Sequence, residues 1–265
     1  MLEENTSMKK WWKIGGLILL CALFCAAIGM ALFGLTPGPL SAKKLDFTEL
    51  AQTVVLIEPG VGMGSGVIID PAGYILTNYH VVEECSPVSI TYKTVANELR
   101  VTVGEVLFGW PDGDLALIKI QAKDLRAIPF GDSSKIKPGD TVYSIGHPFA
   151  LAWTITRGIV STFHKAENGV QIIQHDAGIA PGNSGGLLLN DRGELVGINS
   201  SVSAIQIRAS AEMFYGLPDR PNYRDPWFQL LPLRYSYALS GNLARAFALG
   251  VIAVTQELDP EPSNP

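Results

Sequence analysis

The sequence predicts an all-β fold, because short β-branched or alternating runs follow one another closely and turn signals separate them. Between residues 53 and 201 the runs include GSGVIID, VSITYK, DLALIKI and DTVYSIG, and the turns include DPAG at 70–73 and KPG at 137–139. Many short strands at short spacing are typical of a sandwich or of barrels. No helical periodicity alternates with these runs, which argues against an α/β fold.

The flanking segments are organised differently. Residues 45–52 (LDFTELAQ) predict one or two helical turns, with Asp46 near their start. Residues 203–234 are rich in proline and aromatics and predict a long loop insertion, a kind of segment that is often functional. Residues 235–253 predict a strand and then a short C-terminal helix, and residues 255–265 predict a disordered acidic tail.

The N-terminal part predicts a membrane anchor. Residues 14–35 are 22 residues without a charge, long enough to cross a hydrocarbon core as a helix. Three lysines at positions 9, 10 and 13 precede them, so residues 1–13 should stay cytoplasmic and the rest should be exported. A cleaved signal peptide has the same order of charges and is the alternative. Residues 36–45 then form a linker, which leaves 46–254 as the main domain.

Composition excludes some classes of function. The net charge is −5 and no Lys/Arg cluster occurs outside the N-terminus, so we expect no nucleic-acid partner. Cys85 is the single cysteine after the apolar segment that holds Cys21 and Cys25, so the domain has no internal disulfide and Cys85 is expected to be a buried small hydrophobe. No Cys/His/Glu cluster has metal-ligand spacing, so no metal and no other cofactor is expected.

Three residues in separate segments have the types needed for nucleophilic catalysis. His80 ends the run ILTNYH, Asp114 opens DLALIKI, and Ser184 stands in GNSGG. A serine hydroxyl is a weak nucleophile until a base takes its proton, and the base acts best when a third group orients it. The order His, Asp, Ser along the chain is used by one of the convergent triad solutions.

The segments around these residues resemble the HtrA (Deg) family of chymotrypsin-fold serine proteases. The similarity runs from about residue 46 to about 250 and rests on GSGVIID with GYILTNYHVV, DLALIKI, PFGDSSKIKPGDTVYSIGHPF, TRGIVST, QHDAGIAPGNSGG and GELVGIN, in the order of the family. It implies a double six-stranded β-barrel with the triad between the barrels. It also implies a serine endopeptidase with His80 as base, Asp114 as orienting carboxylate and Ser184 as nucleophile.

The resemblance implies further site residues. Backbone N–H groups of Gly182 and Ser184 correspond to the oxyanion hole, and a side chain at Gly182 would obstruct a carbonyl oxygen that approaches the backbone. The strand 198–202 should pair with the substrate backbone, with Ser200, Ser201 and Val202 nearest to it. Digestive relatives have an aspartate before the nucleophile that pairs with a new N-terminus; Asn183 stands here, so activation by that route is not expected.

The specificity pocket can be read from the positions before the nucleophile. Trypsin-like enzymes that select Lys or Arg have an acidic residue six positions before the serine; this chain has Gly178, followed by Ile179. Cleavage after small or medium apolar residues is therefore expected. Asp176, only two positions further back, weakens this inference.

The other histidines are assigned structural roles. His147, where the family usually has asparagine, is expected in a turn, and His164 at the surface. His175 is expected to be packed and hydrogen-bonded.

The resemblance also suggests how the protein is used. It implies polypeptide substrates and a periplasmic or extracellular role in protein quality control or regulated proteolysis, and HtrA relatives are often trimers. Typical members carry a C-terminal PDZ domain with no counterpart in this sequence, so peptide-triggered activation within one polypeptide is not expected. The alternative is a protease-fold chaperone or binding module whose cleft is closed by residues 203–234.

Overall fold

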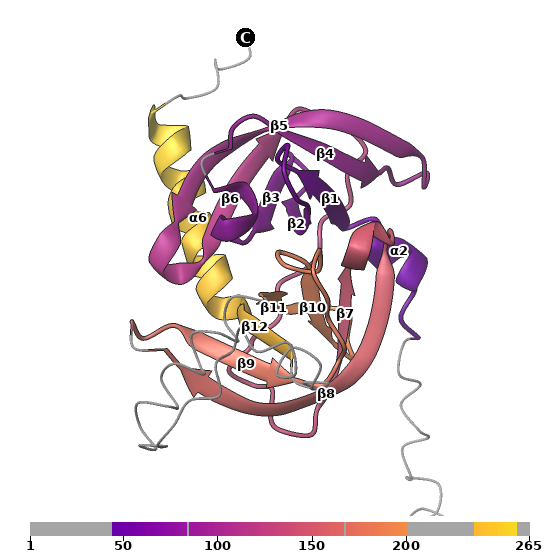
Figure 1. Cartoon of the computed structure of the whole chain (residues 1–265), viewed down its shortest axis with the longest axis vertical. Helices are drawn as coiled ribbons and strands as arrows, with labels where there is room; N and C mark the ends of the chain where they lie inside the picture. The colour runs from indigo at the N-terminus through magenta and orange to yellow at the C-terminus, as the bar shows by residue number, and fades with distance from the viewer. Residues whose placement is uncertain (1–43, 84, 167, 201–235, 259–265) are drawn as a thin grey trace, which may run out of the picture. The chain divides into compact units, whose positions relative to one another are not determined.

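The computed structural model of the chain describes residues 44–83, 85–166, 168–200 and 236–258. The predicted anchor at 14–35, the insertion at 203–234, and Ser201 and Val202 lie outside these residues. Within the described part, no helix is both long enough and apolar enough to span a membrane. The unit that begins at Leu45 contains two closed antiparallel barrels (Figure 1).

The first barrel has the strand order β1-β2-β3-β6-β5-β4. Its strands are β1 (Val54–Glu58), β2 (Gly64–Asp70), β3 (Tyr74–Thr77), β4 (Val88–Lys93), β5 (Leu99–Trp110) and β6 (Leu115–Ile120). The predicted run GYILTNYHVV is a strand only in its first half, because the helix α3 (Tyr79–Val82) follows Asn78. His80 therefore lies on a helical turn that starts directly after β3.

The second barrel has the strand order β10-β11-β12-β9-β8-β7. Its strands are β7 (Thr141–Gly146), β8 (Thr154–Lys165), β9 (Gln171–His175), β10 (Leu187–Asn190), β11 (Leu195–Asn199) and β12 (Ser236–Ser240). The nucleophile segment GNSGG lies in the loop between β9 and β10. The expected double six-stranded barrel is confirmed.

Two helices flank the barrels. The predicted helix near residue 45 is α2 (Phe47–Ala51), and the Asp46 side chain caps it by accepting from the backbone N–H groups of Thr48 and Glu49 at 2.9 and 3.3 Å. The C-terminal helix is α6 (Gly241–Leu258). It extends through the first four residues of the segment predicted as an acidic tail.

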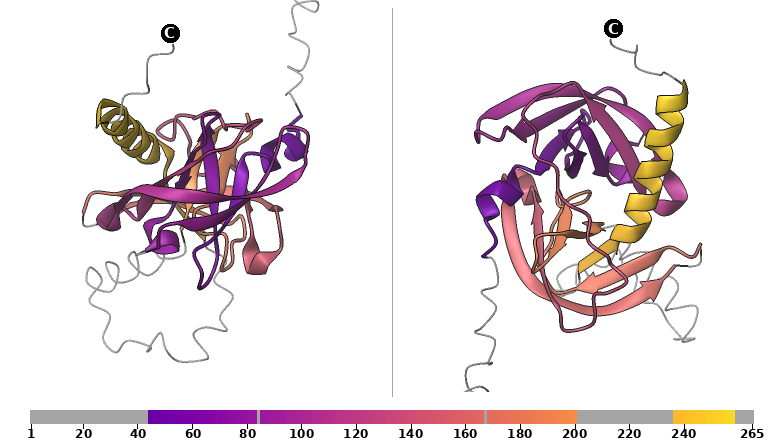
Figure 2. Two further views of the ribbon diagram at one scale, coloured as in Figure 1. Left: turned by 90° about the horizontal axis from the view of Figure 1, so that it is seen from above. Right: turned by 180° about the vertical axis from the view of Figure 1, so that it is seen from behind.

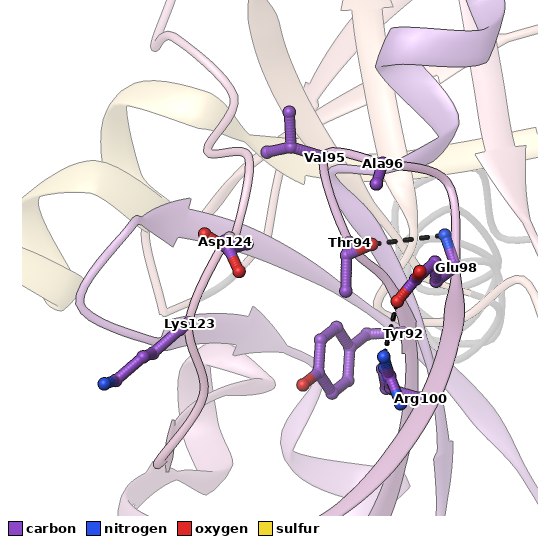
Figure 3. A pocket seen from close by; sticks show the side chains of 8 residues that line it. All are labelled: Tyr92, Thr94, Val95, Ala96, Glu98, Arg100, Lys123 and Asp124. Atoms are coloured by element: carbon purple, nitrogen blue, oxygen red, sulfur yellow. Dashed lines mark hydrogen bonds and ion pairs between the residues drawn. The ribbon is translucent and has the colours of Figure 1, made fainter.

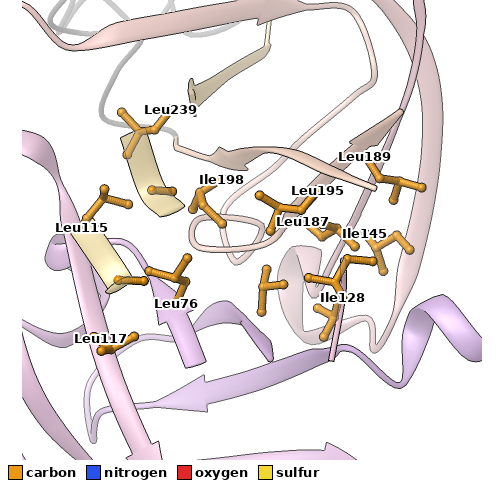
Figure 4. Close-up of a cluster of buried hydrophobic side chains, with 14 of the residues drawn as sticks. Leu76, Leu115, Leu117, Ile128, Ile145, Leu187, Leu189, Leu195, Ile198 and Leu239 are labelled. Atoms are coloured by element: carbon orange, nitrogen blue, oxygen red, sulfur yellow. The ribbon is translucent and has the colours of Figure 1, made fainter. Parts of the chain in front are cut away.

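A shared apolar core joins the barrels. Figure 4 shows Leu76, Leu115 and Leu117 of the first barrel in one buried cluster with side chains of β7, β10 and β11. Helix α6 leaves β12 and passes along the first barrel beside β6, as Figures 1 and 2 show. The ring of Phe247 lies 6.1 Å from that of Phe108 and 6.2 Å from that of Trp110. The relative position of the two barrels, and so of the segments between them, is set by this packing.

Candidate active site

The candidate base and carboxylate are in direct contact. The Nδ1 atom of His80 lies 2.8 Å from Oδ1 of Asp114, and the backbone N–H of His80 donates to the same oxygen at 3.2 Å. Asp114 follows a 3₁₀ turn (Pro111–Gly113) and has left-handed backbone angles (φ 50°, ψ 42°), a conformation that aspartate tolerates better than most residues. The turn directs its carboxylate to the start of α3, where only 5% of the residue is exposed.

Ser200 completes the environment of this carboxylate. Its hydroxyl donates to Oδ2 of Asp114 at 2.7 Å, and the residue is fully buried. The sequence singled out Ser200 for contact with substrate backbone and not for this bond. With one oxygen of Asp114 held by His80 and the other by Ser200, the plane of the carboxylate is fixed from two sides.

Asn78 links the three candidate segments, and sequence analysis missed it. Its side-chain amide donates to the backbone carbonyl of Asp114 at 2.9 Å, and its Oδ1 accepts from the backbone N–H of Gly185 at 2.6 Å. One buried side chain, two residues before His80, thus joins the aspartate loop of the first barrel to the nucleophile loop of the second. An asparagine two positions before the candidate base is a signal in the sequence, but the partners of its amide are visible only in three dimensions.

The nucleophile loop needs glycine at Gly185. This residue has φ +82°, and a Cβ atom there would lie 2.0 Å from the carbonyl oxygen of Ser65. The Gly185 N–H also lies near the carbonyl of Asn199, at 2.9 Å. Ser184, which is 5% exposed, therefore stands on a turn pressed against β2 and the end of β11.

The peptide before Gly182 is held in one orientation by a hydrogen bond. The carbonyl of Pro181 accepts a hydrogen bond from the backbone N–H of Phe149 at 2.8 Å. Because N–H and C=O point in opposite directions across a trans peptide, the N–H of Gly182 points away from Phe149. Gly182 has φ +100°, and an added Cβ would lie 2.3 Å from the carbonyl oxygen of His147, so no other residue fits the loop in this shape.

The predicted base of the specificity pocket carries no acid. A Cβ added to Gly178 would meet nothing within 4 Å, and Ile179 is half-buried. The carboxylate of Asp176 accepts from the backbone N–H of Ile159 on β8 at 2.6 Å. Asp176 was the acidic residue that could have selected Lys or Arg substrates, and its carboxylate is engaged by this bond. Ser201 and Val202, the other predicted substrate contacts, lie outside the described residues.

The remaining histidines have varied surroundings. His147 precedes a 3₁₀ turn (Pro148–Ala150), and burial, with Lys93 nearby, lowers its pKa to about 4. Burial also lowers the pKa of His175 to about 4, although the Ala177 backbone, Asp176 and Asn199 act in the opposite direction.

Three of the expectations for side chains need correction. His175 is packed as expected, but neither of its ring nitrogens makes a hydrogen bond of normal geometry to the described residues. His164 is half-buried, not a surface residue, with Nε2 2.7 Å from Oε1 of Gln174. Cys85 is a free thiol that is only partly buried against the core of the first barrel.

One cavity among the described residues lies apart from this site. A cavity of about 620 Å³ lies where the β4–β5 hairpin meets residues 123–124 (Figure 3), and none of the candidate site residues lines it. Its walls are Tyr92, Thr94, Val95, Ala96, Glu98, Arg100, Lys123 and Asp124. In the part of the chain that the structure describes, no group of three His, Cys, Asp or Glu side chains is placed to hold a metal ion.

The chain is similar to known proteases in sequence. Residues 64–198 match the trypsin-like peptidase domain family. The chain is 45% identical over 143 residues to a probable periplasmic serine endoprotease DegP-like of Marinomonas sp., and 44% identical over 150 residues to the periplasmic serine endoprotease DegP of Salmonella typhimurium. These matches cover 53% and 54% of this chain but only 30% and 31% of those proteins, so the chain spans about a third of the length of these relatives.

Solved structures agree with the sequence relatives. The HtrA-type protease AlgW, solved with a tripeptide, superposes with a TM-score of 0.60 at 28% identity, over 78% of this chain and 64% of that one. A serine endoprotease from Yersinia pestis gives 0.59 at 28% identity, over 79% and 67%. On its matched domain, its two barrels and these relatives, the chain belongs to the trypsin-like peptidases and, among them, to the HtrA family.

Proposed function

We propose that this chain is a serine endopeptidase in which His80, Asp114 and Ser184 form the catalytic triad. The proposal is carried by one observation: Asp114 holds His80 and is itself joined, through Asn78, to the residue that follows Ser184. Membership in the HtrA family and the named activities of the DegP relatives support the same reaction.

The contact with Asp114 favours one tautomer of a neutral His80 ring. An ionised carboxylate only accepts hydrogen bonds, so the Nδ1 atom of neutral His80 carries the proton and Nε2 is left with a lone pair. His80 can then take the proton of the Ser184 hydroxyl as that oxygen attacks a peptide carbonyl. The imidazolium that forms is stabilised by Asp114 and later protonates the leaving amine.

The negative charge of the tetrahedral intermediate requires donors that are already in place. The backbone N–H groups of Gly182 and Ser184 are the proposed donors, in keeping with the orientation of the Pro181–Gly182 peptide. Water then repeats the attack on the acyl-enzyme, with His80 as base, and releases the second product.

Cleavage after small or medium apolar residues is the proposed specificity. Gly178 and Ile179 present no charge, and Asp176 is bonded to the backbone of β8. The end of β11, with Ser200, Ser201 and Val202, is proposed to pair with the substrate backbone.

The cellular setting is proposed from the sequence and from the relatives. Residues 14–35 would anchor the chain in a membrane, with the protease domain in the periplasm or outside the cell, where the DegP relatives are named as periplasmic. Misfolded or membrane-associated polypeptides would be its substrates, and self-association into trimers is part of this proposal.

A fluorophosphonate probe tests the proposed nucleophile. We expect the probe to label the wild-type chain and not the Ser184→Ala variant, because Ser184 is the serine activated by His80. His80→Ala should lower the labelling rate by at least ~10³-fold. Ser134→Ala, which changes an exposed turn serine, is the matched control and should label like the wild type. An unlabelled wild type would instead favour the chaperone or binding alternative.

Digestion of a peptide library tests the proposed pocket. We expect cuts after residues such as Ala, Val and Leu, because no acid at Gly178 or Ile179 can pair with a basic side chain. Product peptides identified by mass spectrometry give the preference directly. A dominant preference for Lys or Arg would contradict the apolar pocket while leaving the triad intact.

A further inference from the structure

Ser65, on β2, contacts both residues that carry the proposed oxyanion donors. Its backbone N–H donates to the carbonyl of Ser184 at 2.8 Å, and its hydroxyl donates to the carbonyl of Gly182 at 2.8 Å. The residue is fully buried, so water does not compete for these bonds. One residue of the first barrel therefore holds the nucleophile loop of the second at two points.

The hydroxyl of Ser65 has a second and a third neighbour, both in His147. The backbone N–H of His147 donates to Oγ of Ser65 at 3.0 Å, and Nδ1 of the ring lies 3.1 Å from the same oxygen. A hydroxyl has one proton, which Ser65 gives to Gly182, so it can only accept from the ring. Neutral His147 must therefore carry its proton on Nδ1.

The ring of His147 is held in place by packing on its far side. It lies edge-on to Trp153 with 5.0 Å between the ring centroids, and the indole N–H of Trp153 donates to the carbonyl of Val54 at 2.8 Å. The Nε2 atom of His147 is buried and makes no hydrogen bond to the described residues. The Lys93 ammonium group over the Trp153 ring is the nearby charge and favours the neutral form of His147.

These bonds fix both peptides that flank Gly182. The carbonyl on its N-terminal side is held by Phe149, and its own carbonyl is held by Ser65. A flip of the Gly182–Asn183 peptide would break the buried hydrogen bond from Ser65 and leave the Gly182 carbonyl without that partner, which is costly in the interior. A flip of the Pro181–Gly182 peptide would break the bond that Phe149 donates to Pro181, and both of these residues are exposed. The Gly182 N–H is thereby kept pointing away from Phe149.

We propose that Ser65 and His147 are positioning residues for the oxyanion hole: the Nδ1–H group of His147 orients the Ser65 hydroxyl, and that hydroxyl anchors the Gly182 carbonyl. Neither residue touches substrate. The proposal rests on the proposed peptidase function for its effect on catalysis, whereas the anchoring of the loop can be measured without turnover.

Kinetics test the effect on catalysis. Removal of one oxyanion donor lowers kcat by about 10²- to 10³-fold. A substitution that only partly disorders the donor loop should lower kcat by less. We expect Ser65→Ala to lower kcat on a peptide substrate by ~10- to 100-fold with KM changed by less than about threefold. Thr53→Val removes a buried hydroxyl that donates to the carbonyl of Leu50, away from the loop, and should retain wild-type kcat.

A conservative exchange separates positioning from simple loss of packing. The amide nitrogen of asparagine stands as many bonds from Cα as Nδ1 of histidine, so His147→Asn can still donate to Ser65. His147→Leu cannot. We expect His147→Asn to keep kcat within about threefold of the wild type and His147→Leu to fall as far as Ser65→Ala.

Hydrogen exchange of the backbone amides at residues 182–186, measured by mass spectrometry, tests independently of activity whether Ser65 and His147 hold this loop in place. Faster exchange in Ser65→Ala and His147→Leu, but not in His147→Asn or Thr53→Val, is the expected result. Unchanged exchange and unchanged kcat in Ser65→Ala would overturn the proposal. If the wild type neither cleaves peptide nor reacts with the probe, the proposed function fails. The exchange rates of the variants still show whether Ser65 and His147 hold the Gly182 loop in place.

Discussion

Buried polar side chains determine the geometry of the site at the level of single residues. Asn78, Ser65 and Ser200 each make hydrogen bonds that cross between sequence segments, and each is fully buried. Each such bond contributes modestly to the free energy of unfolding, but a buried donor or acceptor that loses its partner lowers that free energy by about 1–3 kcal/mol. The site is therefore sensitive to residues that would not take part in the chemistry.

The two buried histidines should make the stability of the fold depend on pH. His147 and His175 have pKa values lowered to about 4, against 6.5 for an unrestrained histidine. Between these values the unfolded chain binds protons that the folded chain does not, so the free energy of unfolding falls as the pH falls from about 6.5 to 4. Each histidine should contribute about 2–3 kcal/mol to the loss between pH 7 and 4.5.

Urea unfolding at several pH values measures this dependence. We expect His147→Asn to lose less stability than the wild type between pH 7 and 4.5, because the variant lacks one group that takes up a proton on unfolding. His164→Gln, at a half-buried position, serves as control. Equal pH slopes for His147→Asn and the wild type would show that His147 is not buried in its neutral form.

At the level of elements, side-chain hydrogen bonds determine where helix α6 begins after strand β12. The start of α6 is tied to the 131–134 loop, where the Asn242 side chain donates to Asp132 at 2.9 Å and accepts from the Ser133 N–H at 3.1 Å. The bond from Asn242, with those from the Ser134 side chain and backbone, holds the pKa of Asp132 well below its usual range. The C-terminal helix therefore begins at a defined point beside β12.

Regular elements could be predicted from sequence because their signals are local. The alternation in VSITYK and the cap at Asp46 predict β4 and α2 from neighbouring residues alone. The helical turn at His80 was missed, because the apolar run that predicts β3 continues through Val81 and Val82 while the chain bends at Asn78. That bend is stabilised by the amide contacts of Asn78, which depend on residues more than 30 positions away.

The candidate site also combines residues that the sequence indicates with contacts between distant residues that it does not. Residue type and segment order were enough to select His80, Asp114 and Ser184, and the structure brings the first two into contact. The bond from Ser200 to Asp114 and the anchor from Ser65 to Gly182 could not be predicted, because they join residues 86 and 117 positions apart. Hydroxyl partners at such separations leave no periodic pattern in the chain.

At the level of the whole molecule, the two barrels share one core and should unfold together. Leu76 of β3 is fully buried in the cluster that also contains Ile145 and Leu187 of the second barrel. Leu76→Ala should lower the free energy of unfolding by about 2–5 kcal/mol through a cavity between the barrels. Because His80 and Ser184 lie on different barrels, fluorophosphonate labelling should be lost at the same urea concentration as β-structure.

Circular dichroism and probe labelling along one urea series measure both midpoints. For Leu76→Ala the two midpoints should shift together. Ile90→Ala, in the separate core of the first barrel, is the comparison variant and should give the same coincidence at its own midpoint. Loss of labelling well before loss of secondary structure would show that the barrels separate before they unfold.

The bridge formed by Asn78 has a consequence for a chain that is still being synthesised. His80 and Asp114 emerge with the first barrel, whereas Gly182, Ser184 and the helix α6 emerge later. Until the second barrel closes, Oδ1 of Asn78 cannot accept the hydrogen bond from the Gly185 N–H, and His80 has no Ser184 hydroxyl to activate. Under the proposed mechanism an unfinished chain cannot cut its neighbours, and proteolytic capacity arises only when synthesis of the domain is complete.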